Sequence, residues 1–403
     1  FPIIRHHFGL PSLEETIEGA RPIAEARVLD VLSIGTDQAA QESFFRPEEL
    51  ARHKAGAGGV PVRKPEDLRA IFEATRTGNY PLLRCYSGTR DQLKWAEMLV
   101  DTINNAWAAI PLTWYSVLDG RSQRPLLQTI RETQEAFKWH GDRGIPVESN
   151  ESHHWSLRDA PDVVAVVMAF LAAYNARKMG VKDYVAQYRF NNPPATSPRM
   201  DLAKMLAKKE LIAELRGPDF EVWTETRAGL SSYPTDLDEA KGHLAFSTAL
   251  QMALKPHIVH VVAFTEAQHA ARAHEVIESV KIARRVIEKV IHDFPDLADD
   301  ERVQQRKEVL KKEAGVLLDA IKRLGESRGA EDPWGDPETL TAAVEMGLLD
   351  APHLRNNPAA KGTVVTQIVD GACVAVDPET KRPLTEEERI ARLMAEEAAG
   401  RAV

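Results

Sequence analysis

Short apolar segments alternate with longer amphipathic segments over the first 295 residues, and this alternation restricts the folds open to the chain. The apolar segments are four to eight residues long and indicate strands, whereas the segments between them repeat their apolar residues at helical spacing. The predicted strands cover residues 27–34, 59–62, 80–86, 109–116, 144–149, 183–190, 220–226 and 257–264. Eight strands, each followed by a helix, are typical of an α/β chain that folds as a (βα)8 TIM barrel.

A doubly wound open sheet is the alternative fold with the same alternation. Such a sheet usually places a glycine-rich turn directly after its first strand. The glycine-rich segment AGAGGV, at 55–60, instead precedes a predicted strand. We therefore predict that residues 1–295 form the barrel.

The pattern changes in the C-terminal quarter of the chain. Residues 299–325 have the pattern of one long, charged amphipathic helix. Asp370 and Gly371 then separate two alternating apolar segments, which is a strong hairpin signal. We expect residues 296–403 to form a helical and β-hairpin lobe packed on the barrel.

The charge balance and the cysteine count argue against several classes of protein. The 403 residues include 51 Lys and Arg against 60 Asp and Glu, a net charge of −9, whereas nucleic-acid binding needs a basic face. No apolar run approaches the ~18 residues of a membrane span, and the N-terminus lacks the order of a signal peptide. Cys85 and Cys373 have no metal or redox spacing. We expect a cytoplasmic protein that acts on a small molecule and contacts neither nucleic acid nor membrane.

Polar side chains that suit catalysis follow the predicted strands. In a (βα)8 barrel the active site lies at the carboxyl ends of the strands. Those ends carry Thr36, Asp37, Arg63, Arg84, Tyr86, Tyr115, Ser116, Arg121, Glu148, Asn150, Glu151, His153, His154, Gln187, Tyr188, Arg189, Glu225, Arg227, Glu266 and His269. Such a set combines bidentate carboxylate binders with acid–base groups. It predicts an enzyme for a small anionic or zwitterionic substrate.

Two other function classes remain open at this point. A metal-dependent barrel hydrolase would use His153 and His154 together with Glu151. One strand end without a second cluster of Asp and His is a weak ligand set, so we expect no metal. The other class is a non-catalytic barrel that only assembles with partners.

Several segments, spread in order over most of the chain, carry a family resemblance. They are LLRCYSGTRDQLKWAEMLV (82–100), RPLLQTIRETQEAF (124–137), GIPVESNE (144–151), FLAAYNARKMGVKDYVAQYR (170–189), ALKPHIVHVVAFTEA (253–267), VEMGLLDAPH (344–353), DGACVAVD (370–377) and LTEEERIARL (384–393). The sequence resembles the large (epsilon) subunit of glutamate mutase, the adenosylcobalamin-dependent methylaspartate mutase. The resemblance implies an isomerase that rearranges the carbon skeleton of an amino acid or related small acid by radical chemistry in a barrel mouth.

The resemblance also implies partners. Cobalamin-binding chains of such mutases carry Asp-x-His-x-x-Gly, and none of the 13 His here has Asp two residues before it. Adenosylcobalamin would therefore be shared with a separate small cobalamin-binding subunit, and this chain would form a homodimer within the hetero-oligomer.

Site residues follow from the resemblance position by position. Arg84 falls on one family arginine that holds substrate carboxylates, Arg121 on a second, and Glu151 or Asn150 near the glutamate that faces the substrate amino group. We expect catalytic roles for Glu151, Tyr188 and Glu266. We expect substrate contacts from Arg84, Arg121, Asp37, Tyr86, Tyr115, Asn150, His153 and His154.

Two of these assignments have structural alternatives. Where the family has an arginine after a Thr, this chain has Asp37, which would favour a neutral or cationic group at the distal end of the substrate. Asp37 could instead cap the next helix or pair with Arg63. Arg84 could instead form an internal salt bridge to Glu148 or Glu151.

Overall fold

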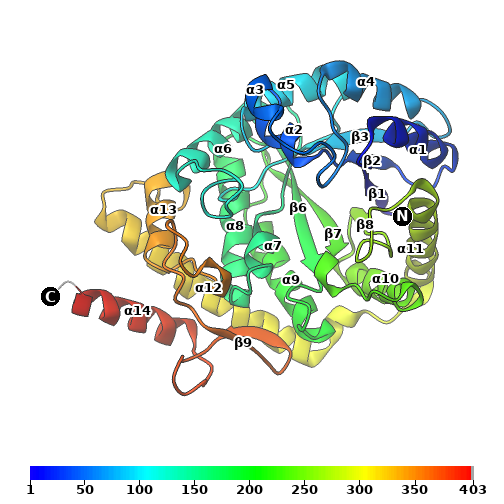
Figure 1. The fold of residues 1–403 in the computed structure, drawn as a ribbon. Helices are drawn as coiled ribbons and strands as arrows, with labels where there is room; N and C mark the ends of the chain where they lie inside the picture. Colours follow the sequence, from blue (N-terminus) through cyan, green and yellow to red (C-terminus); the bar gives the residue numbers. More distant parts are fainter. Residues whose placement is uncertain (401–403) are drawn as a thin grey trace.

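Eight parallel strands and the helices between them form a TIM-barrel fold in the computed structural model, which describes residues 1–400 (Figure 1). The sheet order is β3-β2-β1-β8-β7-β6-β5-β4. The strands are β1 (Ile3–Phe8), β2 (Val31–Ile34), β3 (Leu82–Cys85), β4 (Ala108–Ala109), β5 (Val147–Ser149), β6 (Asp183–Phe190), β7 (Glu221–Ala228) and β8 (Ile258–Val261). This confirms the predicted fold class.

The barrel is nearly closed where β3 meets β4. No ladder joins these two strands, but the N–H of Ala106 donates to the carbonyl of Leu83 at 2.9 Å, and that of Ser87 to Ala109 at 3.4 Å. The predicted strand at 109–116 is much shorter in the structure. After β4 the chain instead forms a buried loop at the barrel mouth.

Helices surround the strands, as Figure 1 shows. They are α1 (Leu13–Glu25), α2 (Gln38–Ser43), α3 (Pro47–Leu50), α4 (Pro65–Ala74), α5 (Gln92–Ile103), α6 (Leu126–Gly141), α7 (Glu151–Ser156), α8 (Asp162–Lys178), α9 (Pro198–Ala213), α10 (Leu237–Gln251) and α11 (Ala273–Asp293). The C-terminal segment adds α12 (Glu301–Ser327), α13 (Pro337–Glu345), the antiparallel pair β9 (Thr366–Val369) and β10 (Ala372–Ala375), and α14 (Glu386–Gly400). None of the helices within residues 1–400 has the length and apolarity needed to cross a membrane.

One predicted strand is wrong and one real strand was not predicted. Segment 59–62 carries only an isolated bridge, because Pro61 cannot donate to a ladder. The first strand is instead Ile3–Phe8, which pairs with both β2 and β8. The buried Arg5 and the partly buried His7 point into the barrel, so the strand lacks the apolar alternation that marks a buried strand.

The barrel interior is built in layers, with alternate strands contributing to each layer. The middle layer takes one ionisable residue from each odd-numbered strand. These four are Arg5, Arg84, Glu148 and Glu225, and all are fully buried. Two cations and two acids in one layer balance each other, so a charged layer can occupy the barrel core.

The C-terminal segment packs on the outside of the barrel. α12 lies against α8 and α9, and its Leu310 and Leu317 belong to the apolar core that these helices build. Asp162, at the start of α8, pairs with Lys204 of α9 at 3.2 Å and Arg306 of α12 at 3.5 Å. The lobe and the barrel therefore share one core.

Candidate active site

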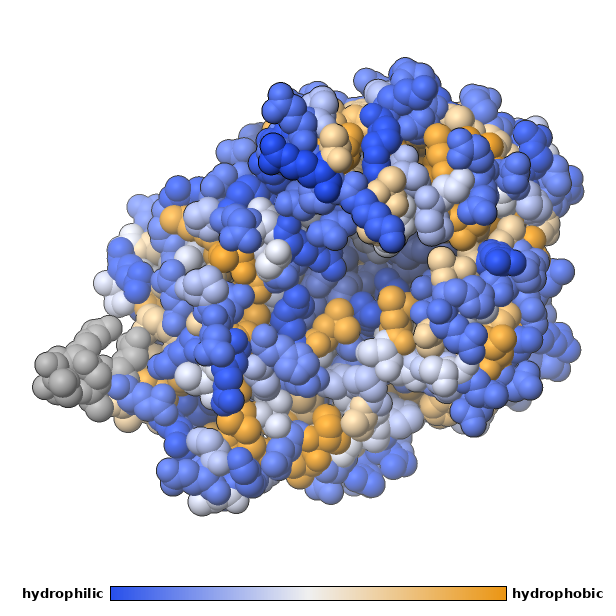
Figure 2. Space-filling model, in the orientation of Figure 1, coloured by the Kyte–Doolittle hydropathy of each residue, from blue (hydrophilic) through white to orange (hydrophobic). Residues whose placement is uncertain are grey.

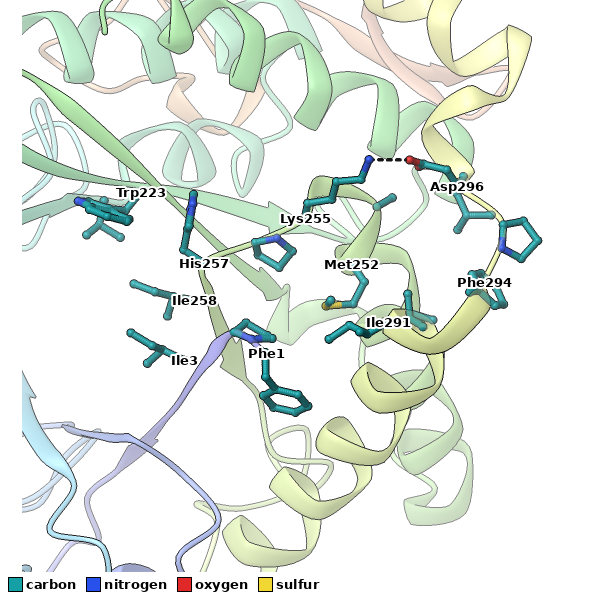
Figure 3. A pocket seen from close by; sticks show the side chains of 18 of the residues that line it. Phe1, Ile3, Trp223, Met252, Lys255, His257, Ile258, Ile291, Phe294 and Asp296 are labelled. Carbon is teal, nitrogen blue, oxygen red and sulfur yellow. Dashed lines mark ion pairs between the residues drawn. The ribbon is translucent and has the colours of Figure 1, made fainter. Parts of the chain in front are cut away.

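Two cavities lie at opposite ends of the barrel. The one at the amino ends of the strands has about 880 Å³ and an apolar lining that includes Ile3, Trp223 and Met252 (Figure 3). The one at the carboxyl ends has about 760 Å³ and is lined by polar groups from most of the strand ends. Figure 2 shows a recess near the middle of one face, with hydrophilic residues inside it and both hydrophilic and hydrophobic residues around its rim. Since barrel enzymes act at the carboxyl ends, this second cavity is the candidate active site.

Seven of the eleven residues predicted for catalysis or substrate contact line this cavity. They are Tyr86, Tyr115, Arg121, Asn150, His153, His154 and Glu266. They come from the segments after β3, β4, β5 and β8. Tyr115 has a positive φ of 66°, and the guanidinium of Arg121 lies 5.2 Å from the centre of its ring. The loop after β4 thus brings an aromatic ring and a cation to the mouth together.

His153 and His154 lie on α7, which begins directly after β5. Their rings stack with centroids 4.4 Å apart, and burial lowers the pKa of both well below the ordinary value. Their Nδ1 and Nε2 atoms respectively, together with Oδ1 of Asn150, are buried without a hydrogen-bond partner among the described residues. No group of three or more His, Cys, Asp and Glu side chains in that part of the chain is placed to hold a metal ion. These neutral rings can exchange hydrogen bonds with a polar ligand.

Two further histidines of the cavity were not predicted. His7 of β1 accepts or donates at Nε2 with the Tyr86 hydroxyl, 2.7 Å away, and its ring lies 4.5 Å from that of His260. His260 in turn contacts Arg5 of the middle layer at 2.8 Å. In the sequence these inward-facing positions are polar residues two apart in β1. They could be assigned to the cavity only if the segment had been predicted as a strand.

Arg84 does not line the cavity. It lies in the middle layer, fully buried, and its Nη2 donates to Glu148 at 2.6 Å. Arg5 donates to the same carboxylate oxygen at 2.7 Å. The structure therefore forms the internal salt bridge that the sequence left open as the alternative. Nε and Nη1 of Arg84 are buried without a hydrogen-bond partner among the described residues, and the contact with a substrate carboxylate stays a prediction.

Glu151 and Tyr188, which are predicted as catalytic residues, also do not line the cavity. The Glu151 carboxylate accepts from the N–H of Leu112 and Thr113 and from the indole of Trp155, so it fastens α7 to the loop after β4. Tyr188 points outward from β6 into the apolar core under the helices, because strand residues alternate between the two faces. Both side chains thus have structural contacts, and their catalytic roles stay predictions.

Asp37 likewise makes its contacts within the fold and does not line the cavity. It is fully buried, caps α2 through the N–H of Ala40 at 2.9 Å, and accepts from the N–H of Gly56 at 3.0 Å. Arg63 holds both of its oxygens in a bidentate ion pair, at 3.0 and 2.5 Å. The structure thus forms the alternative that the sequence left open, a helix cap paired with Arg63, and the contact with the distal end of the substrate stays a prediction.

The cavity carries more cations than acids. Three arginines, Arg121, Arg189 and Arg227, line it, against one carboxyl group, that of the half-buried Glu266. Burial raises the pKa of Glu266, which weakens its negative charge further. Such a lining suits an anionic ligand.

Comparisons with known proteins agree with this picture at the family level. The family model described as Methylaspartate mutase E chain (MutE) matches residues 3–402. No curated protein matches the chain. Similar solved structures include phospho-2-dehydro-3-deoxyheptonate aldolase from Thermotoga maritima (TM-score 0.43, 12% identity, 72% of this chain and 70% of that one). Another is N-acetylneuraminic acid synthetase from Leptospira borgpetersenii (TM-score 0.42, 12% identity, 76% and 92%). Since the family model spans nearly the whole sequence, the chain belongs to the methylaspartate mutase E chain family.

Proposed function

We propose that this chain is the substrate-binding large subunit of an adenosylcobalamin-dependent carbon-skeleton mutase. It acts by radical rearrangement on an amino acid or a related small acid of the glutamate or 3-methylaspartate kind. The observation that carries the proposal is the family match over residues 3–402. An arginine-rich cavity at the carboxyl ends of the barrel strands supports it.

The residues of the cavity divide the work on such a substrate. Arg121 offers a guanidinium fork to a carboxylate at the rim. The carboxyl group of Glu266 is the acid of the cavity that faces a substrate amino group. The rings of Tyr86 and Tyr115 form apolar walls that exclude water from the substrate skeleton.

The cavity residues also fit the cofactor's adenosyl group. When bound, adenosylcobalamin supplies an organic radical through homolysis of its Co–C bond. The unpartnered buried atoms of Asn150, His153 and His154 would hold polar, uncharged groups of that moiety. A cavity of about 760 Å³ suits a small acid and part of a cofactor. The rest of the cofactor would lie in the small subunit, which carries Asp-x-His-x-x-Gly and covers the mouth of each copy in a dimer of this chain.

The test mixes the purified chain with a small cobalamin-binding subunit and adenosylcobalamin. Amino acids and small acids are added one at a time, and Co–C homolysis is followed by absorbance. We expect one class of acid to trigger homolysis, and Arg121→Gln to weaken its apparent affinity by about tenfold or more. Arg143→Gln is the matched control, because Arg143 also stacks on an aromatic ring, that of Trp139, but away from the cavity. Homolysis by no acid in the panel would refute the proposal.

A further inference from the structure

Two arginines lie side by side in the cavity wall. Arg189 of β6 is the register partner of Arg227 of β7. Each has 6% of its surface exposed, and both line the cavity. One step earlier on the same strands, Gln187 donates to Glu225 at 2.8 Å inside the barrel. Since residues two apart on a strand share a face, the two arginines also point inward, one layer above that pair.

Neither arginine has a carboxylate partner within residues 1–396. Arg227 makes one hydrogen bond, from Nε to the carbonyl of Ala228 at 3.3 Å, whereas Nε of Arg189 is buried without a partner. The barrel itself provides the contrast, because Arg5 and Arg84 in the layer below both bind Glu148. Arg5 and Arg84 thus belong to the framework, whereas Arg189 and Arg227 face the cavity without a carboxylate partner among residues 1–396.

This arrangement is unfavourable in the free chain. Like charges on directly opposed strand residues repel, and burying a cation without a partner costs free energy. Burial, together with Arg227, lowers the pKa of Arg189 to about 9. An anion placed between the two guanidinium groups would remove both penalties at once.

We propose that Arg189 and Arg227 form a binding site for a carboxylate of the substrate, separate from Arg121 at the rim. The identification of the bound acid with the substrate rests on the proposed function. A planar carboxylate accepts one hydrogen bond at each oxygen, so each arginine can bind one oxygen across the two strands. The substrate then lies against β6 and β7, and its reacting carbon atoms extend toward the mouth.

The test uses the full-length chain without cofactor or small subunit. Isothermal titration measures binding of L-glutamate, glutarate, butyrate and inorganic phosphate. We expect the chain to bind at least one of the three acids, and both Arg189→Gln and Arg227→Gln to weaken that binding on the order of 30-fold. Arg227→Lys should weaken it less, because it keeps the charge and loses only the fork. Arg143→Gln, outside the cavity, should bind as the wild type does.

Thermal unfolding separates a ligand site from a structural role. Removing one of two repelling, unpaired cations should leave the melting temperature of the ligand-free chain unchanged or higher. Arg84→Gln, which breaks a buried ion pair, should lower it. A lowered melting temperature in both cavity variants, with unchanged acid binding, would overturn the proposal.

Other outcomes are equally decisive. If the chain binds only phosphate through the two arginines, or binds none of the three acids, the carboxylate assignment is wrong. Because the titration needs no cofactor, its failure is distinguishable from failure of the mutase. A chain that binds an acid through this pair, yet shows no Co–C homolysis, would keep this site and lose the mutase proposal.

Discussion

Glu148 shows how much one buried carboxylate holds in place. One of its oxygens accepts from Arg5, Arg84 and the indole of Trp107, and the other from Gln187. Burial alone would raise its pKa, but the two neighbouring guanidinium groups outweigh burial and hold the pKa below its ordinary value. The residue therefore remains ionised and fixes four buried side chains in the barrel interior.

Replacing Glu148 should destabilise the chain strongly. Glu148→Gln leaves two buried cations with one acid, and breaking a buried pair in this way costs about 3–5 kcal/mol. Urea unfolding measures the loss. The matched control is Glu338→Gln, since Glu338 pairs with Arg131 on the surface with half of each side chain exposed. That pair should contribute less than about 1 kcal/mol. Equal losses in the two variants would contradict a structural role for Glu148.

Asp37 should behave as a structural residue too. Asp37→Asn removes the charge that Arg63 and the cap of α2 use, so we expect a loss of about 1–2 kcal/mol in the free energy of unfolding. Affinity for any bound acid should stay as in the wild type. Urea unfolding and isothermal titration on the same variant check both statements. Altered ligand preference without lost stability would return Asp37 to the substrate site.

At the scale of elements, the sequence predicts the helices and strands of the barrel better than it predicts which side chains fill the barrel interior. Amphipathic helices and seven strands could be found because their apolar periodicity reflects burial. β1 escaped detection because Arg5 and His7 occupy inward positions where apolar residues are expected. The sequence left Arg84 with two roles, a substrate contact or a salt bridge to Glu148 or Glu151, because it does not say how deep in the barrel a strand residue lies. Contacts between distant strands decide that depth.

Helix α12 connects the C-terminal lobe to the barrel, because it packs on α8 and α9. Its Leu317 is fully buried against the core shared with α8 and α9. Leu317→Ala should cost about 3 kcal/mol and lower the melting temperature of the whole chain in a single transition. Tryptophan fluorescence and circular dichroism would report that transition together. Val309→Ala, on the exposed side of the same helix, should have little effect. Two separate transitions would show that the lobe unfolds independently of the barrel.

For the whole molecule, histidines in the interior lower the stability of the folded chain in acid. Burial lowers the pKa of six of them, namely His6, His7, His140, His153, His154 and His260. In the unfolded chain, histidines take up protons below about pH 6.5, whereas these folded rings stay neutral. Their contribution to stability is therefore complete above that pH and is lost as the pH falls. Glu225 opposes this trend between about pH 4.3 and 7, since burial raises its pKa to about 7 and the folded chain keeps a proton there that the unfolded chain releases.

His140 lies away from the cavity, so its replacement tests the contribution of a single buried histidine to the pH dependence of stability. Burial lowers its pKa to about 4, so unfolding takes up one proton more there between pH 6.5 and 4. His140→Gln should reduce the slope of unfolding free energy against pH by up to about 1.4 kcal/mol per pH unit over that range. Urea unfolding at a series of pH values gives the slope. The exposed His274, replaced by Gln, should leave it unchanged.

The layer of two arginines and two glutamates also affects whether small molecules can pass through the barrel. Its four side chains are fully buried between the two cavities, so the barrel interior is closed at this layer in the part of the chain that the structure describes. In a mutase of the proposed kind, reactants and products would therefore enter and leave at the carboxyl ends of the strands. A small subunit docked over this opening would then limit the rate of product release, because the product could not leave through the amino ends of the strands.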